Sequence, residues 1–599
     1  MKTTSNTTRL PVYLLMALAL IPWLLYLNTL HFEPVLDDRQ YVLMNPLLAS
    51  GWSFLFPFNF SEFSRSFMTL DISSDFPLNF ILRPVTYMTW FINRLIHGQD
   101  TAGYRLVNIF LHMMNAIMLW KILRSLLDDE SRRTLILTWF IAVLFAVHPM
   151  NVESVTYIAQ RSETLVTLFG LLAMWYHLQS TTHPNTTGTM PSLVFTLLAM
   201  LSKESAVVLP LVLLLINRLW ANCDWKLAIK RVRWHLLLTP VLPLLLLATS
   251  WAQSSELNLT KTLNITNIGT DPMPWAHYLM SQIYGWLHYL RFLILPVGQS
   301  FDHDFPLITT ATDERLVGAI LFLLLLCGAV WHAANQATGK RGATLKLGVI
   351  WFFVFLLPSS SFIPLPDLFA EHRCYFSSIG FFFSVGALLT IVPGKASEGR
   401  QELAPSFMAT LTALGLAVAT IARNDVMRTK ASLWADAFAK GSDSSRVWKG
   451  LGIAAHEAGD FKLALERFTR ATEKSPRDFE AWANVAGLQL HLKRAQDAIS
   501  TLEKAEAAIG LTAPIAHLRA VAFLRVGRND EAIQLWQMIL SNYPSHRHAN
   551  LCLGEIYMQL GRPRDSLDCI ERASRSGALS KHHQTIRAKA EEKLGLAAR

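Results

Sequence analysis

The chain has 599 residues, of which 52% are apolar and only 16% are charged. This composition is too apolar for an ordinary soluble protein, so we expect an integral membrane protein. The net charge of +10 is then first explained by basic cytoplasmic loops, and without a basic and aromatic patch it does not indicate nucleic-acid binding. The five cysteines lack metal-ligand spacing and are too sparse for a disulfide scaffold.

The chain begins with a short basic head and then a run of about 17 apolar positions, "LPVYLLMALALIPWLLYL". No small-x-small cleavage pattern follows the run, which predicts an uncleaved first membrane span. Further apolar windows bring the predicted number of spans to eleven. The predicted spans are residues 11–30, 104–126, 134–147, 163–179, 191–202, 205–220, 234–251, 314–333, 345–358, 375–393 and 405–422.

A cytoplasmic N-terminus places the basic loops around residues 121–133, 218–233, 340–346 and 395–400 on the inside, as the positive-inside rule requires. Two alternatives remain open. Residues 191–220 could form one long helix instead of a hairpin turning at Ser202–Ser205, and the aromatic segment 275–294 could be an extra span instead of an interfacial helix. Either change alone moves several basic loops to the wrong side. The preferred topology sends the C-terminal region outside.

Five polar clusters then fall on the outer face of the membrane. Loops are polar in most membrane proteins, so one cluster alone means little. However, charged residues inside or at the ends of spans are costly and commonly mark a site. The clusters are Asp37–Asp38, residues 147–163 with His148, Glu153, Arg161 and Glu163, residues 202–205 with Lys203 and Glu204, residues 300–306 with Asp302 and Asp304, and residues 366–375 with Glu371 and Arg373.

An outward carboxylate at a membrane surface suits transfer of a sugar from a lipid phosphate to a hydroxyl. The carboxylate removes the hydroxyl proton, since an apolar rim raises its pKa toward working pH. Cations stabilise the departing phosphate. Asp37 and Asp38 equally fit two other roles, because adjacent carboxylates can cap the next helix or ligate a divalent cation such as Mg²⁺ or Mn²⁺.

Residues 445–580 divide into four consecutive units of 34 residues. The turn position recurs as Gly459, Lys493, Gly527 and Gly561, the small position as Ala464, Ala498, Ala532 and Ser566, and the bulky position as Phe468, Leu502, Trp536 and Ile570. This is the tetratricopeptide pattern, which predicts an α-solenoid that binds an extended peptide or a partner protein. We expect a polytopic domain over 1–424, a linker over 425–444, four repeats over 445–580 and a capping helix over 581–599.

Six further segments appear in order before the repeats: "DDRQYVLMNPLL", "RPVTYMTWFINRLIHGQDTAGYRLVNIFLHMMNAIMLW", "LFAVHPMNVESVTYIAQRSETLVTLFGLLAM", "LLAMLSKESAVVLPLVLL", "LILPVGQSFDHDFP" and "LPSSSFIPLPDLFAEHRCYFSSIGF". Together they resemble the transmembrane and tetratricopeptide repeat family of O-mannosyltransferases. The resemblance implies an all-α membrane glycosyltransferase of the GT-C architecture with a polyprenyl- or dolichyl-phosphate sugar donor.

The resemblance also implies roles for individual residues. The family's diacidic motif falls on Asp37 and Asp38, its "HP" motif with a following acid on His148 and Glu153, and its "SKE" motif on Lys203 and Glu204. Its "FDxD"-like turn falls on Asp302 and Asp304. Its "AER" motif falls on Glu371, but His372 stands in the place of the usual arginine and Arg373 follows it.

The sequence therefore predicts a transferase that moves a sugar, with mannose as one candidate, to Ser or Thr of exported proteins. Asp37 or Asp38 is the expected base, and His148, Arg161, Lys203 and Arg373 are the expected phosphate ligands. Glu153, Glu163, Glu204, Asp302, Asp304 and Glu371 are expected to support them. Short loops and a compact repeat array favour a bacterial inner membrane with the site and the repeats on the periplasmic side. Two rivals remain, a membrane scaffold without enzymatic activity and a transferase that acts on lipid or polysaccharide.

Overall fold

The computed structural model describes residues 10–45, 48, 82–182, 188–241, 244, 273–360, 364–365, 367–391, 403–575 and 579–596. Every regular element in these residues is helical, which confirms the all-α fold class. The described residues up to Lys440 form one compact unit, here called the membrane unit, and those from Gly441 form a second, the repeat unit.

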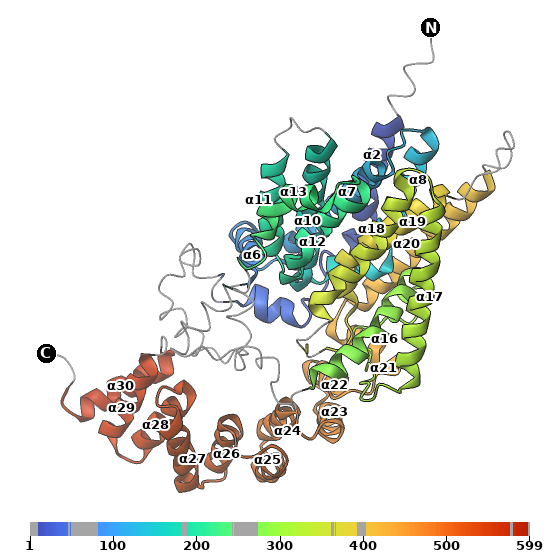
Figure 1. The fold of residues 1–599 in the computed structure, drawn as a ribbon. Helices are drawn as coiled ribbons and strands as arrows, with labels where there is room; N and C mark the ends of the chain where they lie inside the picture. Colours follow the sequence, from blue (N-terminus) through green and yellow to red (C-terminus); the bar gives the residue numbers. More distant parts are fainter. Residues whose placement is uncertain are drawn as a thin grey trace. The chain divides into compact units, whose positions relative to one another are not determined.

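The membrane unit is built on long apolar helices that share one hydrophobic core. Helix α7 contacts α2, α8 and α10, and each helix from α16 to α18 contacts the next one in the chain; Figure 1 labels these helices. The helices are α2 (Leu10–Tyr26), α6 (Pro84–His97), α7 (Thr101–Leu127), α8 (Arg132–Ala146), α9 (Val152–Thr156), α10 (Arg161–Thr182), α11 (Thr189–Met200), α12 (Leu209–Leu215), α13 (Trp225–Leu236), α16 (Trp275–Ile294), α17 (Glu314–Gln336), α18 (Lys340–Leu356), α19 (Cys374–Ile391), α20 (Leu403–Val426) and α21 (Lys430–Ala439).

Five stretches of the described chain are long and apolar enough to cross a membrane, which makes this a membrane protein. They are Leu10–Thr29, Thr101–Leu127, Glu314–Gln336, Lys340–Ser359 and Glu371–Ile391. A sixth span results if the bent pair Arg132–Ala146 and Pro149–Thr156, which turns by 51°, crosses as one. The predicted total of eleven therefore stays a prediction, and the span predicted at 234–251 falls largely outside the described residues.

The two ambiguous segments have definite helical structure. Helix α11 ends at Met200 and the next helical turn begins at Glu204, so residues 191–220 do not form one long helix. The break falls where Lys203 adopts an extended backbone and pairs through its side chain with Glu163. Segment 275–294 is one continuous helix, α16, and its position as a span or an interfacial helix stays a prediction.

Helices α18 and α19 approach each other at two glycines, Gly348 and Gly380. A methyl group on Gly380 would collide with the carbonyl oxygen of Gly348 and lie 2.6 Å from the amide nitrogen of Phe352. Both obstacles are backbone atoms, which cannot move without separating the helices. Close packing at this crossing therefore requires a residue without a side chain.

Replacing Gly380 with Ala is expected to destabilise the membrane unit by about 1–3 kcal/mol, because the extra methyl overpacks the crossing. Thermal unfolding of the purified protein in detergent measures the effect. Gly328→Ala in α17 is the matched control, since its methyl would meet no atom within 4 Å. Equal unfolding midpoints for the two variants would contradict the packing argument.

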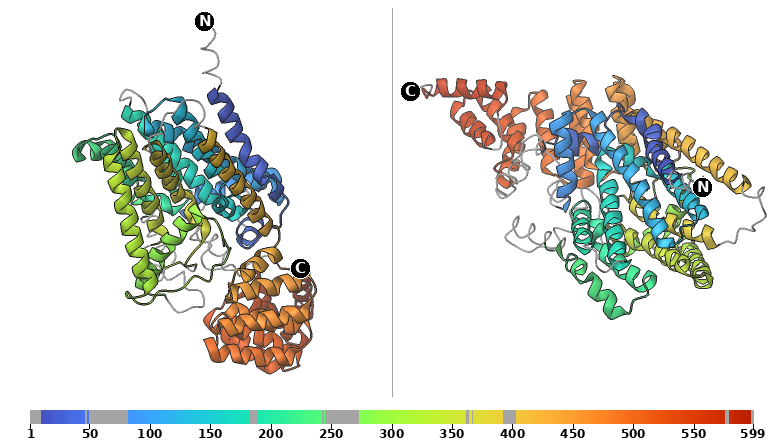
Figure 2. Two further views of the ribbon diagram at one scale, coloured as in Figure 1. Left: turned by 90° about the vertical axis from the view of Figure 1, so that its right-hand side faces the viewer. Right: turned by 90° about the horizontal axis from the view of Figure 1, so that it is seen from above.

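The repeat unit stacks antiparallel helix pairs in succession (Figure 2). The small positions of the four predicted repeats are fully buried, and the bulky positions are at most 4% exposed. A methyl on Gly452 would lie 2.5 Å from the Phe468 ring, which shows why small residues are needed between paired helices. The helices are α22 (Ser445–Glu457), α23 (Phe461–Lys474), α24 (Phe479–His491), α25 (Ala495–Ile509), α26 (Ala513–Arg525), α27 (Asn529–Asn542), α28 (Arg547–Gln559), α29 (Pro563–Ser574) and α30 (Lys581–Lys593).

All four predicted turn positions have a positive φ, between 61° at Lys493 and 82° at Gly527. Glycine adopts this conformation without strain, whereas a lysine does so at a cost. The register of the repeat therefore holds Lys493 in a conformation that its own side chain disfavours.

Candidate functional site

The two carboxylates of the diacidic motif have opposite environments. Asp38, the first residue of a short π-helix (Asp38–Leu43), is 0% exposed, whereas Asp37 is exposed. The Asp38 Oδ1 atom accepts the Ala159 N–H at 2.8 Å, while its Oδ2 atom makes no hydrogen bond to any described residue. The backbone N–H of Asp37 donates to the Tyr157 hydroxyl at 3.0 Å. Asp38 therefore presents one anchored oxygen and one uncommitted oxygen.

The Asp38 carboxyl is poised to hold a proton near neutral pH. Burial raises its pKa to about 7, although Arg105 and the backbone N–H groups of Ala159 and Ile158 act in the opposite direction. A carboxyl with this pKa can be ionised at working pH and still accept a proton readily, as a general base must.

Arg105 near the start of α7 holds the segment that leads to Asp38. Its buried guanidinium donates to the carbonyl oxygens of Phe32 at 2.6 Å, Glu33 at 3.0 Å and Leu30 at 3.1 Å, and to that of Thr156 at 3.2 Å. One side chain thus joins the loop after α2 to the end of α9. Arg105 is absent from the predicted site residues, and its signal in the sequence is a charge within a predicted apolar span.

The corner between α20 and α21 holds the same segment from another direction. The Glu33 N–H donates to the Arg428 carbonyl at 3.0 Å, and the Lys430 N–H donates to the Glu33 carboxylate at 3.3 Å. Asn424 in α20 donates to the Leu25 carbonyl and accepts from Thr156. Residues 424–430 therefore belong structurally with the Asp38 loop.

Arg161, predicted to bind phosphate, is fully buried in a polar network at the start of α10. It donates to the Asn93 side chain at 2.6 Å, the Asn108 side chain at 2.8 Å, the Tyr104 carbonyl at 2.9 Å and Thr89 at 3.2 Å. These contacts occupy all three guanidinium nitrogens. In this conformation Arg161 orders the ends of α6, α7 and α10 behind Asp38.

The predicted "SKE" residues form two ion pairs. Lys203 pairs with Glu163, and both side chains are largely buried. Arg83 binds Glu204 through two hydrogen bonds of 2.6 and 2.8 Å, and this pair is partly exposed. Arg83 is a second residue that the sequence analysis did not single out.

Glu153 and Glu371 meet in a buried charged cluster. Glu371 accepts from the Ser300 N–H, the Gln299 amide and His303 at 2.7–2.9 Å. Glu153 accepts the His372 N–H at 3.2 Å and lies 3.6 Å from Arg423 of α20. His372, which stands where the resembled family has arginine, thus contacts Glu153.

The remaining predicted residues are bound by nearby backbone. His148 is buried, its Nδ1 accepting the Met150 N–H at 3.2 Å and its Nε2 lying 3.1 Å from the Leu293 carbonyl oxygen. Arg373 donates to the Asp367 carbonyl at 2.7 Å. Asp302 accepts the N–H of Asp304, whose φ is +43°, in a turn next to the Glu371 cluster.

All of the predicted site residues lie at one end of the membrane unit. Residues 148–163 connect them, because this segment contacts Asp38, Lys203 and the Glu371 cluster in turn. Within the described part of the chain, no group of three or more His, Cys, Asp or Glu side chains has the arrangement of a metal site.

Comparison with known proteins finds similar sequences among the protein O-mannosyl-transferases. The chain is 26% identical over 469 residues to Protein O-mannosyl-transferase F38B6.6 of Caenorhabditis elegans, a match covering 77% of this chain and 62% of the relative. It is 24% identical to Protein O-mannosyl-transferase TMTC3 of Mus musculus, over 80% of this chain and 55% of the relative. Protein O-mannosyl-transferase Tmtc3 of Drosophila melanogaster is 25% identical, with 80% and 59% covered.

The chain is a relative of the protein O-mannosyl-transferases. It spans little more than half the length of these curated relatives. The tetratricopeptide repeat family matches residues 449–511 and 517–575, which confirms that this region consists of tetratricopeptide repeats. Among solved structures, the crystal structure of MamA matches 24% of this chain and 84% of its own at 17% identity and a TM-score of 0.22, which carries no further argument.

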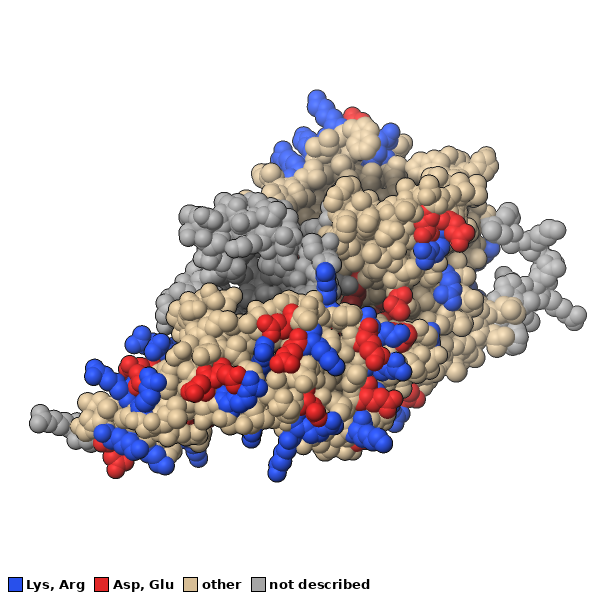
Figure 3. Space-filling view, turned by 90° about the horizontal axis from the view of Figure 1, so that it is seen from below, with Lys and Arg blue, Asp and Glu red and all other residues tan. Residues whose placement is uncertain are grey.

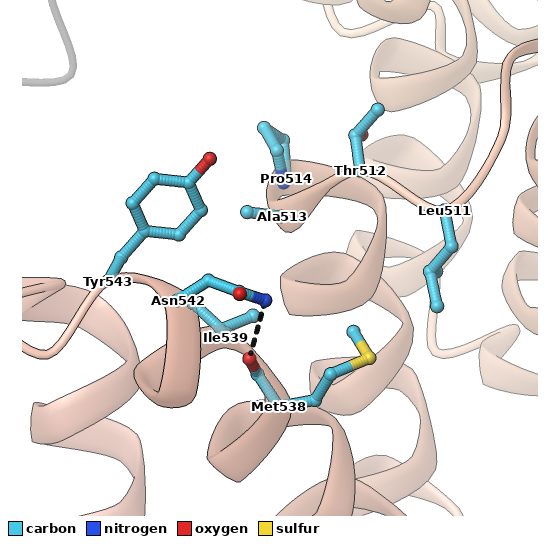
Figure 4. Close-up of a pocket in the computed structure, with 8 residues that line it drawn as sticks. All are labelled: Leu511, Thr512, Ala513, Pro514, Met538, Ile539, Asn542 and Tyr543. Atoms are coloured by element: carbon cyan, nitrogen blue, oxygen red, sulfur yellow. Dashed lines mark hydrogen bonds between the residues drawn. The ribbon is translucent and has the colours of Figure 1, made fainter.

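The repeat unit has a cavity of about 600 Å³ (Figure 4). It lies between the start of α26 and the end of α27, where Tyr543, Pro514 and Met538 supply apolar surface. The Asn542 amide, which donates to the Met538 carbonyl at 3.4 Å, supplies polar atoms. The face of this unit in Figure 3 carries Lys and Arg interspersed with Asp and Glu, so it shows no patch of one sign.

Proposed function

We propose that the protein is a membrane glycosyltransferase that moves one sugar from a polyprenyl phosphate to the hydroxyl of Ser or Thr in an exported protein. Its curated relatives are named protein O-mannosyl-transferases, which makes mannose the first sugar to test. The observation that carries the proposal is Asp38, a buried carboxylate with an uncommitted oxygen and a pKa raised to about 7. A scaffold without enzymatic activity has no use for such a group, because a buried charge costs stability.

The proposed reaction is a single displacement. The acceptor O–H transfers its proton to Asp38 Oδ2 as its oxygen attacks the anomeric carbon. The bond between that carbon and the phosphate oxygen breaks, and the polyprenyl phosphate departs with the electron pair. One base and no second nucleophile predict inversion at the anomeric carbon. Because Asp38 is buried, the acceptor has to displace part of the covering loop to reach Oδ2.

The basic residues near Asp38 have two different proposed roles, which are to hold the structure around Asp38 and to bind the donor phosphate. Arg105 positions the Asp38 loop, and Arg161 orders the helix ends behind it. Lys203 and Arg83, already paired with Glu163 and Glu204, are the cations that we assign to the donor phosphate. An arriving phosphate would compete with those carboxylates for the same N–H groups.

We further propose that the Asp38 end faces the periplasm of a bacterial cell and that the repeats present the acceptor protein. The basic loops lie at the opposite end of the membrane unit, and the positive-inside rule places such loops in the cytoplasm. This supports a periplasmic position for the Asp38 end. The cavity beside Tyr543 has the size and mixed lining of a site for an acceptor side chain.

The test uses the purified full chain in lipid nanodiscs with a panel of polyprenyl-phosphate sugars and candidate exported proteins. Intact-mass spectrometry is expected to show acceptors heavier by one hexose, together with release of polyprenyl phosphate. Donor consumption without a protein mass change would assign the acceptor to lipid or polysaccharide. If none of the donors is consumed, the result would favour a membrane scaffold without enzymatic activity.

A further inference from the structure

Helix α13 lies at the end of the membrane unit opposite Asp38. Helix α10 begins in the candidate site at Arg161, and His177 follows sixteen residues later, about 24 Å along the helix axis. The rings of His177 and His235, which is in α13, have centroids 5.6 Å apart. Helix α13 is thus anchored at the far end of α10.

One face of α13 is packed against the unit and the other faces away from it. Ala228, Val232 and His235 are fully buried, and Ser192 of α11 lies 2.9 Å from His235 Nε2. On the opposite face, Lys226, Lys230 and Arg233 are spaced i, i+4 and i+7, so they form one exposed basic stripe.

Large apolar side chains flank this basic stripe on both sides. Trp225 is 52% exposed, Trp234 is 51% exposed, and Leu237 after the helix is 63% exposed. Apolar groups of this size are costly to leave in water but fit the boundary between headgroups and acyl chains, where tryptophan is enriched. A basic stripe between them fits anionic headgroups at the same depth.

Cationic side chains also lie near tryptophan rings in other helices at the end of the membrane unit that carries α13. Six close approaches of a Lys or Arg to a Trp ring occur here, at 4.1–5.8 Å from the ring centroid. The pairs are Lys121–Trp175, Arg124–Trp120, Arg218–Trp225, Arg233–Trp234, Lys340–Trp220 and Lys346–Trp331. The cations and tryptophans thus form a belt around one end of the membrane unit, and α13 is its exposed helix.

We propose that the exposed face of α13 binds anionic phospholipid headgroups at this membrane surface. The basic stripe supplies the charge selectivity, and Trp225, Trp234 and Leu237 insert beside the acyl chains. This binding does not depend on sugar transfer.

The test is hydrogen–deuterium exchange of the full chain in nanodiscs of phosphatidylcholine alone or with phosphatidylglycerol. Amides of residues 225–237 are expected to exchange on the order of fivefold more slowly in the anionic nanodiscs, because bound headgroups oppose opening of the helix. The variant Lys226→Gln/Lys230→Gln/Arg233→Gln is expected to lose this difference. The charge-retaining variant Lys226→Arg/Lys230→Arg/Arg233→Lys is expected to keep it.

A matched control removes three exposed lysines of the repeat unit, Lys462→Gln/Lys504→Gln/Lys589→Gln, and should leave the difference intact. Equal exchange in the two nanodiscs would overturn the proposal, whether α13 is protected in both or in neither. A difference that persists in the glutamine variant of α13 would also overturn it. The charge-retaining variant distinguishes loss of lipid binding from loss of folding.

Discussion

Replacing Asp38 with Asn is expected to reduce the rate of sugar transfer by roughly 10²–10⁴-fold, the usual contribution of a general base. Asparagine keeps an oxygen for the Ala159 N–H but cannot accept the acceptor's proton. The initial rate of polyprenyl-phosphate release in nanodiscs measures the loss. The matched control is Asp37→Asn, since Asp37 is the exposed member of the pair and its backbone N–H keeps its hydrogen bond to the Tyr157 hydroxyl.

The same residue sets the expected pH dependence. The rate of the wild-type protein should rise with pH through about 7, where Asp38 loses its proton, and then level off. A pKa raised in the folded state also means that ionisation opposes folding. Below the unfolded pKa of 3.8 the Asp38 carboxyl is protonated in both states and does not change the stability. The destabilisation grows between pH 3.8 and about 7, and above that it stays constant at roughly 4 kcal/mol.

Asp38→Asn should therefore raise the midpoint of thermal unfolding at pH 8 and leave it nearly unchanged at pH 4. A variant that loses activity while gaining stability is hard to explain by misfolding. If instead Asp37→Asn stops transfer and Asp38→Asn retains it, the base is Asp37. If both variants transfer sugar at the wild-type rate, the diacidic motif has no part in catalysis.

Replacing Arg105 with Gln is expected to cost roughly 3–5 kcal/mol of stability, because buried carbonyl oxygens lose a charged hydrogen-bond donor. Four carbonyl oxygens lose their donor, including those of Phe32 and Glu33 in the segment that leads to Asp38. The positive charge that favours ionised Asp38 is also lost, so the pH midpoint of activity should move upward. Thermal unfolding and the pH profile of donor consumption measure the two effects separately.

Arg105→Lys distinguishes the two contributions. Lysine keeps the charge but cannot reach all four carbonyls, so it should lower stability while leaving the pH midpoint close to that of the wild type. Arg124→Gln, near the other end of the same helix, is the matched control and should leave the midpoint unchanged. A wild-type pH profile in Arg105→Gln would show that Arg105 has no electrostatic effect on Asp38.

The sequence was most informative where the pattern was repetitive. The helices of the repeat unit follow from an unbroken 34-residue period, and the glycine turns could be predicted because three of four positions carry the residue that a positive φ favours. The break near Ser202 could be predicted because Lys203 and Glu204 are costly inside an apolar helix. Local chemistry was enough in each of these cases.

The candidate site was less accessible from sequence, because its contacts join distant segments. Nothing local distinguishes Asp37 from Asp38, and only the fold buries one of them beneath residues 157–159. Arg161 and His148 have the chemistry of phosphate ligands, yet buried amides and carbonyls engage them. Arg105 binds carbonyls about seventy residues away in the chain, which no motif indicates.

The attachment of residues 424–430 to Glu33 and Leu25 bears on where the polypeptide can be divided. A fragment ending at residue 423 would keep each of the five described stretches that are long enough to cross a membrane. It would lack Asn424, Arg428 and Lys430, which hydrogen-bond to the segment before Asp38. Cleavage after Lys440 spares both those groups and the whole of α21. Any separately produced membrane unit should extend to that lysine, and a protease site inserted there would release the repeats without loosening the Asp38 loop.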